Sequence, residues 1–234
     1  NRSLTGDGNR KTLNIISEII PININEIKSG TKVYDWKVPK EWNIKSAWIK
    51  DSSGKKLIDF DENNLHVISY SIPINKKMKW KDLKKHIHTN KLKENVIDYR
   101  TSYYKENWGF SVTWSQFKKL ANHKGELHVF IESSLKNGSL SYGELLIEGS
   151  SRKEILISTY ICHPSMANDN LSGILCTAFL AKYLSKIKNR KWSYRIIFIP
   201  ETIGALAYCK KNEKIIKKID HGLVISNVGG PGKF

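Results

Sequence analysis

The stretch that decides the fold is EILISTY, residues 154–160, a nearly continuous apolar run. Runs of this kind are typical of strands buried on both faces of a sheet. The chain then passes through CHPS at residues 162–165 and a short loop to NDNLSG at residues 168–173. From Leu171 to Ile187 the apolar residues recur at helical spacing, which predicts a long helix. Its expected core residues are Leu175, Ala178, Phe179, Ala181, Tyr183 and Leu184.

Strands and helices continue to alternate around this stretch. The patterns predict strands at Tyr142–Ile147, Tyr194–Ile199 and Leu223–Asn227, the last two of them buried, and a helix at Gly204–Asn212. Strand, helix, strand, helix, strand indicates an α/β sheet with helices on its faces. In open sheets of this class, sites form at the carboxyl ends of the strands.

The first 130 residues follow a different pattern. A helix is predicted over Thr5–Ile20, and Pro21 ends it. From Ile22 to about Phe130 short alternating runs such as Thr31–Val38 and Ser46–Lys50 predict β structure, with short helices at Lys79–His86 and Thr113–Leu120. We therefore expect residues 1–30 to supply the first helix of the α/β domain, 31–134 to form a β-rich insertion, and 135–234 to form the rest of the α/β domain.

The formal net charge of +17 raises the question of a nucleic-acid partner. Most of the basic residues are lysines, scattered or in short runs such as Lys76-Lys77 and Lys217-Lys218. No arginine-rich stretch interleaved with aromatic residues stands out, so the electrostatic footprint of a nucleic-acid binder is missing. An ordinary lysine-rich surface is the better interpretation, and we expect no nucleic-acid partner.

The cysteines and the hydropathy pattern favour a cytoplasmic protein. The three cysteines are an odd number with no CxxC spacing, which argues against a disulfide framework and fits a reducing compartment. No apolar run approaches the roughly 20 residues that cross a bilayer, so no membrane span is expected. The chain begins abruptly with Asn1, and we treat both of its ends as truncated.

Three side chains of types that bind metal ions or accept a proton from water follow the buried strands. His163 comes after the first strand, Asp169 opens the long helix and Glu201 follows the next strand. Imidazole and carboxylate are zinc ligands, and a further carboxylate can deprotonate water. Taken singly, each has a structural alternative: Asp169 as a helix N-cap, His163 as a buried structural histidine, and Glu201 as a helix cap. Their convergence on one sheet edge favours a metal site.

The motifs around these residues resemble a known family. DNLSG at 169–173 and ETIG at 201–204 are similar to the DNxSG and EExG segments of the zinc aminopeptidase superfamily with co-catalytic metals. Longer stretches resemble a bacterial branch of aminopeptidase-like proteins, often encoded among surface-polysaccharide genes. These stretches are RSLTGDG at 2–8, DWKVPKEW at 35–42, HIHT at 86–89, SYY at 102–104, WGF at 108–110, STYICHPS at 158–165 and FIPETIG at 198–204.

This resemblance implies a fold and a set of roles. The fold would be a zinc-aminopeptidase-like, phosphorylase/hydrolase-like three-layer sheet with a small inserted β-rich domain. His163 would be the first zinc ligand, and Asp169 the second, matching the family's bridging Asp. Glu201 matches the first Glu of EExG, the general base that activates water. A histidine beyond Phe234 would complete the site.

The sequence departs from the family pattern at three positions. Thr202 replaces the second Glu of EExG, and Ser165 stands where the typical HxD motif has its Asp. After the third strand, Ser226 and Asn227 occupy the place of a metal-binding Asp. These departures imply one zinc ion rather than two, or a weakened site.

Two further groups lie outside the predicted site. His86 and His88 have one residue between them on an extended segment, so both would face one side of it. They are auxiliary ligands, substrate contacts or, as we favour, surface or structural histidines. Cys162 beside His163 suggests a thiol nucleophile, but a small buried residue at a strand end is the better interpretation.

The sequence thus predicts a zinc-dependent hydrolase that cleaves an amide, with a peptide or an amide-containing small molecule as substrate. The alternative is a catalytically weakened relative with a binding or accessory role in surface-polysaccharide biosynthesis. An amidohydrolase acting on an amino-sugar derivative would share the mechanism. The oligomeric state, including a homo-oligomer, stays open.

Overall fold

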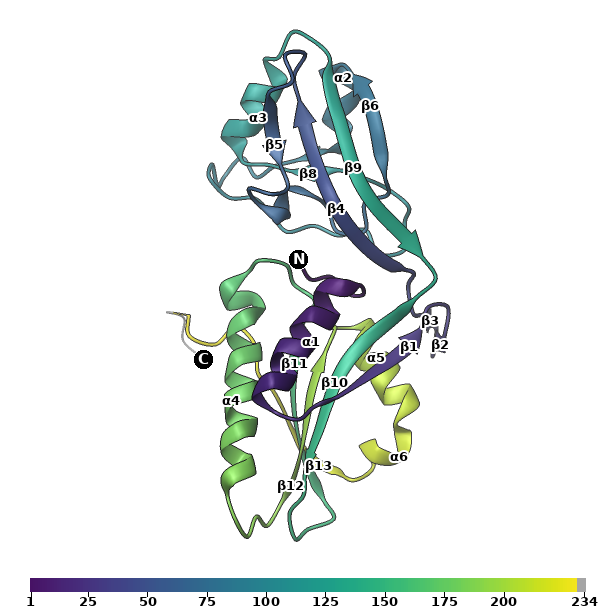
Figure 1. Ribbon diagram of the computed structural model, residues 1–234, viewed down its shortest axis with the longest axis vertical. Helices are drawn as coiled ribbons and strands as arrows, with labels where there is room; N and C mark the ends of the chain where they lie inside the picture. The colour runs from purple at the N-terminus through teal and green to yellow at the C-terminus, as the bar shows by residue number, and fades with distance from the viewer. Residues whose placement is uncertain (231–234) are drawn as a thin grey trace. The chain divides into compact units, whose positions relative to one another are not determined.

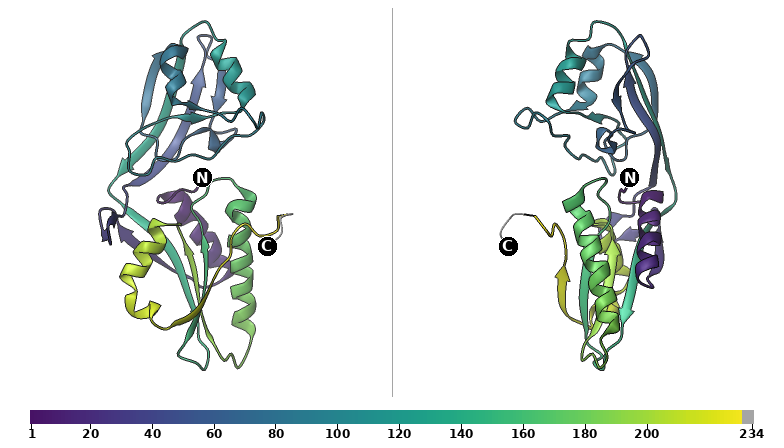
Figure 2. Two further views of the ribbon diagram at one scale, coloured as in Figure 1. Left: turned by 180° about the vertical axis from the view of Figure 1, so that it is seen from behind. Right: turned by 60° about the vertical axis from the view of Figure 1, so that its left-hand side comes forward.

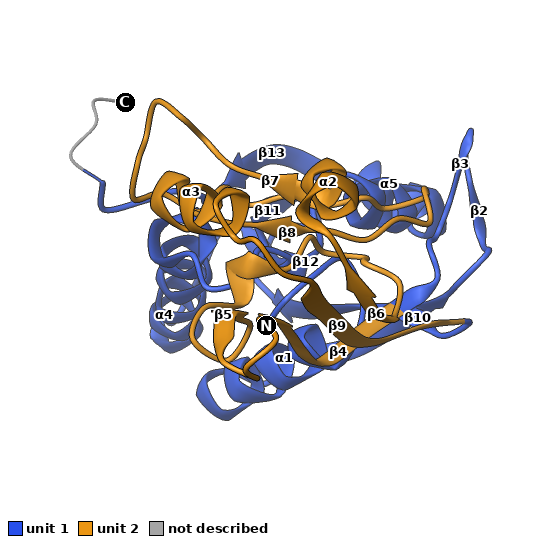
Figure 3. Ribbon diagram, turned by 90° about the horizontal axis from the view of Figure 1, so that it is seen from above, with its two compact units in different colours: residues 1–41, 137–234 blue, residues 42–136 orange. Residues whose placement is uncertain are grey.

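The computed structural model describes residues 1–230, which Figures 1 and 2 show from three sides. The chain divides into two compact units (Figure 3). Unit 1 combines Asn1–Glu41 with the chain from Asn137 onward, and unit 2 is Trp42–Lys136. The sequence pattern had placed the β-rich insertion at 31–134. Residues 32–37, in that stretch, form a small hairpin of unit 1, with β2 at Lys32–Val33 and β3 at Trp36–Lys37.

Unit 1 is built on one five-stranded sheet (Figure 1). Its strand order is β1 (Asn23–Lys28), β10 (Ser139–Ile147), β12 (Ser193–Ile199), β11 (Glu154–Tyr160) and β13 (Ile219–Val224). β11 runs parallel to both β12 and β13, while β10 is antiparallel to β12 and β1. The carboxyl ends of β11, β12 and β13 therefore meet at one edge of the sheet.

Helices cover both faces of this sheet (Figures 1 and 2). α1 (Asp7–Ile19) and α4 (Gly173–Lys186) pack on one face through Leu13, Ile174 and Ala178 against Ile196 and Phe198. α5 (Ile203–Lys211) lies on the other face and is followed by α6 (Glu213–Ile216). The predicted mixed α/β fold and the helix over Thr5–Ile20 are therefore confirmed.

The face toward α5 carries a buried ionic cluster. Arg195 of β12, 7% exposed, donates to both carboxylate oxygens of Glu154 and to Glu144. The hydroxyl of Tyr208 on α5 donates to Glu144 across 2.7 Å. Burial, and then Glu144, raise the pKa of Tyr208, so that phenol stays protonated. The cluster joins three strands and one helix.

Burial of two elements was predicted wrongly. β13 runs from Ile219 to Val224, earlier than the expected Leu223–Asn227, and Val224 is 66% exposed. On α4, the expected core residues Leu175, Phe179 and Tyr183 are 43%, 57% and 65% exposed. They follow one another at four-residue spacing and form a stripe on the side of α4 away from the sheet. Periodicity predicts that a face is apolar, but it does not specify what covers that face.

Unit 2 is a four-stranded sheet with short helices. Its order is β5 (Lys56–Asp59), β4 (Glu41–Lys50), β9 (Leu127–Lys136) and β6 (Ile74–Met78). A two-stranded sheet adds β7 (Ile87–His88) and β8 (Phe110–Ser111), and η1 spans Asn64–His66. The core includes Ile49, Leu83, Phe110 and Leu127.

The short helices of unit 2 confirm the predictions made for them. α2 (Trp80–Leu83) continues into the 3₁₀ turn η2 (Lys84–His86), within the expected Lys79–His86. α3 (Trp114–Ala121) begins at a capping box in which Thr113 and Gln116 each satisfy the other's backbone N–H. Among residues 1–230, none of the helices combines the length and the apolarity that crossing a bilayer requires.

Candidate metal centre

The carboxyl ends of β11 and β12 bring together the three site residues predicted from the sequence. His163 lies three residues beyond β11, and Glu201 lies between β12 and α5. Asp169 lies in the kinked turn η3 (Ala167–Ser172) that leads into α4, and its own backbone is not helical. His163 Nδ1 is 3.9 Å from Asp169 Oδ1, and His163 Nε2 is 3.5 Å from Glu201 Oε1. The imidazole thus stands between two carboxylates.

Burial differs between the imidazole and the two carboxylates. The side chain of His163 is 9% exposed, whereas those of Asp169 and Glu201 are 39% and 35% exposed. A buried imidazole is held in one orientation by its surroundings, while half-buried carboxylates remain open to water and to a small molecule. The arrangement therefore gives fixed donor atoms at a surface that solvent reaches.

Cys162 is a neighbour that the sequence analysis did not count among the ligands. Ligand atoms of Cys162, His163 and Glu201 all lie within 4.8 Å of one another. The backbone N–H of Glu201 donates to Cys162 Sγ across 3.4 Å, which ties the two strand ends together. Burial raises the pKa of the thiol to about 12. Cys162 is the buried residue that the sequence predicted, and its thiol is protonated rather than nucleophilic at neutral pH.

Tyr160 positions Asp169. Its hydroxyl donates to Asp169 Oδ1 across 2.6 Å and accepts from Asn227 Nδ2 at 3.0 Å. Burial, followed by the neighbouring carboxylate, raises the pKa of Tyr160 to about 12, so the phenol keeps its proton. No sequence signal indicated this role, because Tyr160 ends an apolar strand and looks like one more core residue.

Asn170 and Gly173 explain why a DNxSG pattern suits this turn. The amide of Asn170, 1% exposed, donates to Thr159 Oγ1 and to the Tyr160 carbonyl, and its Oδ1 accepts from the Asn227 N–H. A Cβ at Gly173 would lie 2.3 Å from Asn170 Oδ1 and 2.5 Å from the Ile225 carbonyl oxygen. The glycine therefore leaves room for Asn170 to bridge the ends of β11 and β13, while the preceding Asp169 stays at the site.

Two backbone features frame the site. Arg2 Nε donates to the His163 carbonyl across 2.9 Å, so the start of the chain fixes the His163 backbone. Ser165, Thr202 and Asn227 have φ of 44°, 54° and 52°, a region that residues other than glycine seldom adopt. These are positions at which the sequence departs from the expected carboxylate pattern. Strained backbone of this kind concentrates at functional sites.

The donor set fits a zinc ion. Zinc lies about 2.0–2.2 Å from imidazole and carboxylate ligands, so two ligands of one ion are less than about 4.4 Å apart. The distance from His163 Nδ1 to Asp169, 3.9 Å, and the distance from His163 Nε2 to Glu201, 3.5 Å, each meet this condition. They involve the two different ring nitrogens, so a zinc ion on Nδ1 would pair His163 with Asp169, and one on Nε2 would pair it with Glu201. Imidazole and carboxylate are both ligand types that zinc accepts.

The mixed α/β fold of the chain is similar to the fold of aminopeptidases. A zinc aminopeptidase from Bacillus subtilis superposes with a TM-score of 0.63 at 12% identity, covering 97% of this chain and 65% of that one. An aminopeptidase from Aneurinibacillus sp. strain AM-1 gives a TM-score of 0.52 at 14% identity, covering 98% of this chain and 67% of that one. At such identities these likenesses show the fold alone.

The chain belongs to the family described as "Domain of unknown function (DUF4910)", which matches residues 1–234. A Clostridium acetobutylicum protein named "Putative polysaccharide biosynthesis protein with aminopeptidase-like domain" is 54% identical over 231 residues, 99% of this chain and 52% of the relative. The crystal structure of a protein called a putative peptidase from Clostridium acetobutylicum superposes with a TM-score of 0.95 at 53% identity, covering 99% of this chain and 54% of that one.

The predicted resemblance to aminopeptidase-like proteins is therefore confirmed. The chain spans about half the length of these two relatives.

Proposed function

We propose that this chain carries part of the active site of a zinc-dependent, aminopeptidase-like hydrolase that cleaves a peptide or another amide. The observation that supports the proposal is the convergence of His163, Asp169 and Glu201 at the carboxyl ends of two parallel strands. Their donor atoms lie 3.5 and 3.9 Å apart, with two of the three side chains open to solvent.

The residues would divide the work in the following way. His163 and Asp169 would hold the metal, and Tyr160 would keep the Asp169 carboxylate in place through its hydroxyl. Zinc supplies a Lewis acid that polarises a carbonyl and acidifies water. Glu201 would accept the proton of the attacking water and then deliver it to the nitrogen of the leaving amine. The departures at Ser165, Thr202 and Asn227 favour one zinc ion.

The decisive measurement is zinc per chain in the full-length protein by elemental analysis. We expect about one zinc ion per chain, the stoichiometry of a mononuclear site. We expect the His163→Ala variant to lose that ion. His221→Ala is the matched control, because its side chain is 75% exposed on β13 and pairs with Asp220 rather than with the site. A wild-type protein without zinc would overturn the hydrolase proposal.

Removing the hydroxyl that positions Asp169 should weaken metal binding without abolishing it. In Tyr160→Phe we expect about a tenfold loss of zinc affinity, the lower end of the range for a residue that orients a ligand. The measurement is competition with a chromogenic zinc chelator. Tyr194→Phe, a half-buried tyrosine on β12, is the control. An unchanged affinity in Tyr160→Phe would mean that Asp169 is held by other contacts or is no ligand.

One further function has an observation in its favour. Three positions where the family pattern has carboxylates hold Ser165, Thr202 and Asn227, and the Clostridium acetobutylicum relative is named for polysaccharide biosynthesis. A catalytically weakened protein with an accessory role in that process would retain zinc yet hydrolyse nothing. A panel of aminoacyl anilides, peptides and N-acetylated amino sugars separates the two functions.

A further inference from the structure

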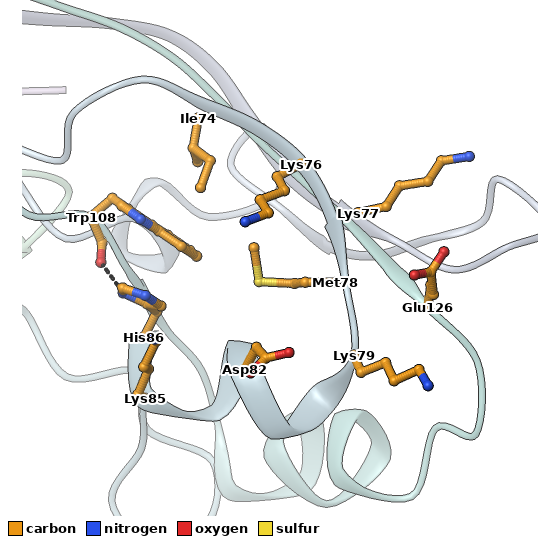
Figure 4. A pocket seen from close by; sticks show the side chains of 10 residues that line it. All are labelled: Ile74, Lys76, Lys77, Met78, Lys79, Asp82, Lys85, His86, Trp108 and Glu126. Carbon is orange, nitrogen blue, oxygen red and sulfur yellow. Dashed lines mark hydrogen bonds between the residues drawn. The ribbon is translucent and has the colours of Figure 1, made fainter.

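A cavity of about 610 Å³ lies within unit 2, built wholly from residues between Ile74 and Glu126 (Figure 4). This volume is in the range of small-molecule sites. Ile74, Lys76 and Met78 reach it from alternate positions of the edge strand β6. The ring of Trp108 and the imidazole of His86 form another side, stacked with centroids 3.7 Å apart.

The cavity combines an apolar surface with an excess of positive charge. Ile74, Met78 and Trp108 supply the apolar part, and in Figure 4 the Trp108 ring extends toward Met78 and the ammonium of Lys76. Four lysines line the cavity against two carboxylates, and none of the four has an ion-pair partner among residues 1–230. They are Lys76, Lys77, Lys79 and Lys85, and the carboxylates are Asp82 and Glu126.

His86 adds a hydrogen-bond acceptor to the wall. Its Nδ1 lies 3.0 Å from the Trp108 carbonyl oxygen, and because a carbonyl can only accept, Nδ1 carries the hydrogen. Burial lowers the pKa of His86, which keeps the imidazole neutral at neutral pH. A neutral imidazole protonated at Nδ1 presents Nε2 as an acceptor. His86 and the Asp82 carboxylate can therefore receive hydrogen bonds from hydroxyl groups.

We propose that this cavity binds an anionic saccharide, a pyranose that carries a carboxylate or a phosphate. The apolar face of a sugar ring would pack on Trp108 and Met78, its hydroxyls would donate to Asp82 and His86, and its anion would meet Lys76. This site is independent of the proposed hydrolase chemistry. Its residues belong to unit 2, and its test measures saccharide affinity rather than hydrolysis.

A second cavity lies near the first, around the edge strand β6. It has a volume of about 280 Å³ and shares Lys77 and Glu126 with the larger one. Lys50 and His128 also line it. Lys77 alternates with Lys76 and Met78 along β6 and pairs with His128, so the smaller cavity lies on the opposite face of the sheet and is a separate hollow.

Lys76 also has a purely structural alternative. A lysine on the inward side of an edge strand discourages pairing with another chain, and β6 pairs only with β9 in this sheet. That role requires no ligand, so the alternative predicts no saturable binding of any saccharide.

Isothermal titration calorimetry on the full chain tests the proposal. The probes are digalacturonate and glucose 1-phosphate, which separate carboxylate from phosphate, with maltose as the neutral disaccharide and triglutamate as a non-saccharide anion. We expect saturable binding of at least one anionic sugar, and a Kd weakened about tenfold in Lys76→Gln, as for a lost charge-assisted hydrogen bond. Lys76→Arg should restore most of the affinity.

The matched control is Lys119→Gln, which removes the same charge from exposed α3 outside the cavity and should leave the Kd within about twofold. Equal binding of triglutamate and the anionic sugars would overturn the proposal, since it would reflect general charge attraction. Equal loss in Lys76→Gln and Lys119→Gln would overturn it for the same reason. No saturable saccharide binding would leave Lys76 with its edge-protecting role alone.

Discussion

Turnover should fall by about 10²–10⁴-fold in Glu201→Gln, the range that general-base catalysis contributes, with zinc content unchanged. Glutamine keeps the size of the side chain but cannot accept a proton from water. The position of Glu201 suits a base, because its carboxylate is 3.5 Å from His163 Nε2 and its side chain is 35% exposed. The measurement pairs steady-state hydrolysis of aminoacyl anilides with elemental analysis of the same samples.

The zinc content decides between two roles for Glu201. Cys162, His163 and Glu201 have ligand atoms within 4.8 Å of one another, so Glu201 is also placed where a ligand would be. Loss of zinc in Glu201→Gln would make it a ligand and remove it as the base. Glu213→Gln on α6 is the control, because that carboxylate is 57% exposed and pairs with Lys210.

Sequence reasoning located β11 and β12 well because an apolar run is a local feature, but it placed β13 at 223–227 instead of 219–224. The apolar run at 154–160 coincides with β11, and parallel strands must end at a shared edge, so His163, Asp169 and Glu201 were expected near one another before any distance was known. The burial of α4 and β13 was not predictable in this way, because burial depends on which other segments cover a face.

The supporting contacts of the site depend on the path of the loops. Tyr160 contacts Asp169 across a loop in which Ser165 has φ of 44°, and Asn227 reaches Tyr160 from beyond another strand. The closeness of Cys162 to Glu201 follows from the hydrogen bond that the Glu201 backbone N–H donates to Cys162 Sγ. Neither strand pattern nor residue type encodes such contacts.

Arg195→Met should destabilise unit 1 by about 3–5 kcal/mol, the cost of breaking a buried ion pair by removing one partner. Methionine fills much of the volume but leaves two buried or half-buried carboxylates without their cation. The side chain of Arg195 is 8% exposed, that of Glu154 5% and that of Glu144 17%, so water screens the cluster poorly. Urea unfolding followed by circular dichroism measures the loss.

A matched surface pair and a second substitution separate charge from packing in this cluster. Lys153→Met removes the partner of Asp220 from a pair in which the lysine is 65% exposed, and it should cost less than about 1 kcal/mol. Adding Glu154→Leu to Arg195→Met should recover part of the loss, because it removes a carboxylate that would otherwise stay buried and unpaired. If the double variant is less stable than Arg195→Met, the cluster contributes through packing of β11 on β12 rather than through charge.

Because Glu201 follows β12 and His163 follows β11, such a packing defect would also loosen the donor atoms at the far end of both strands, and zinc affinity would fall together with stability. A purely electrostatic loss at the opposite end of the strands would lower stability and leave zinc affinity intact.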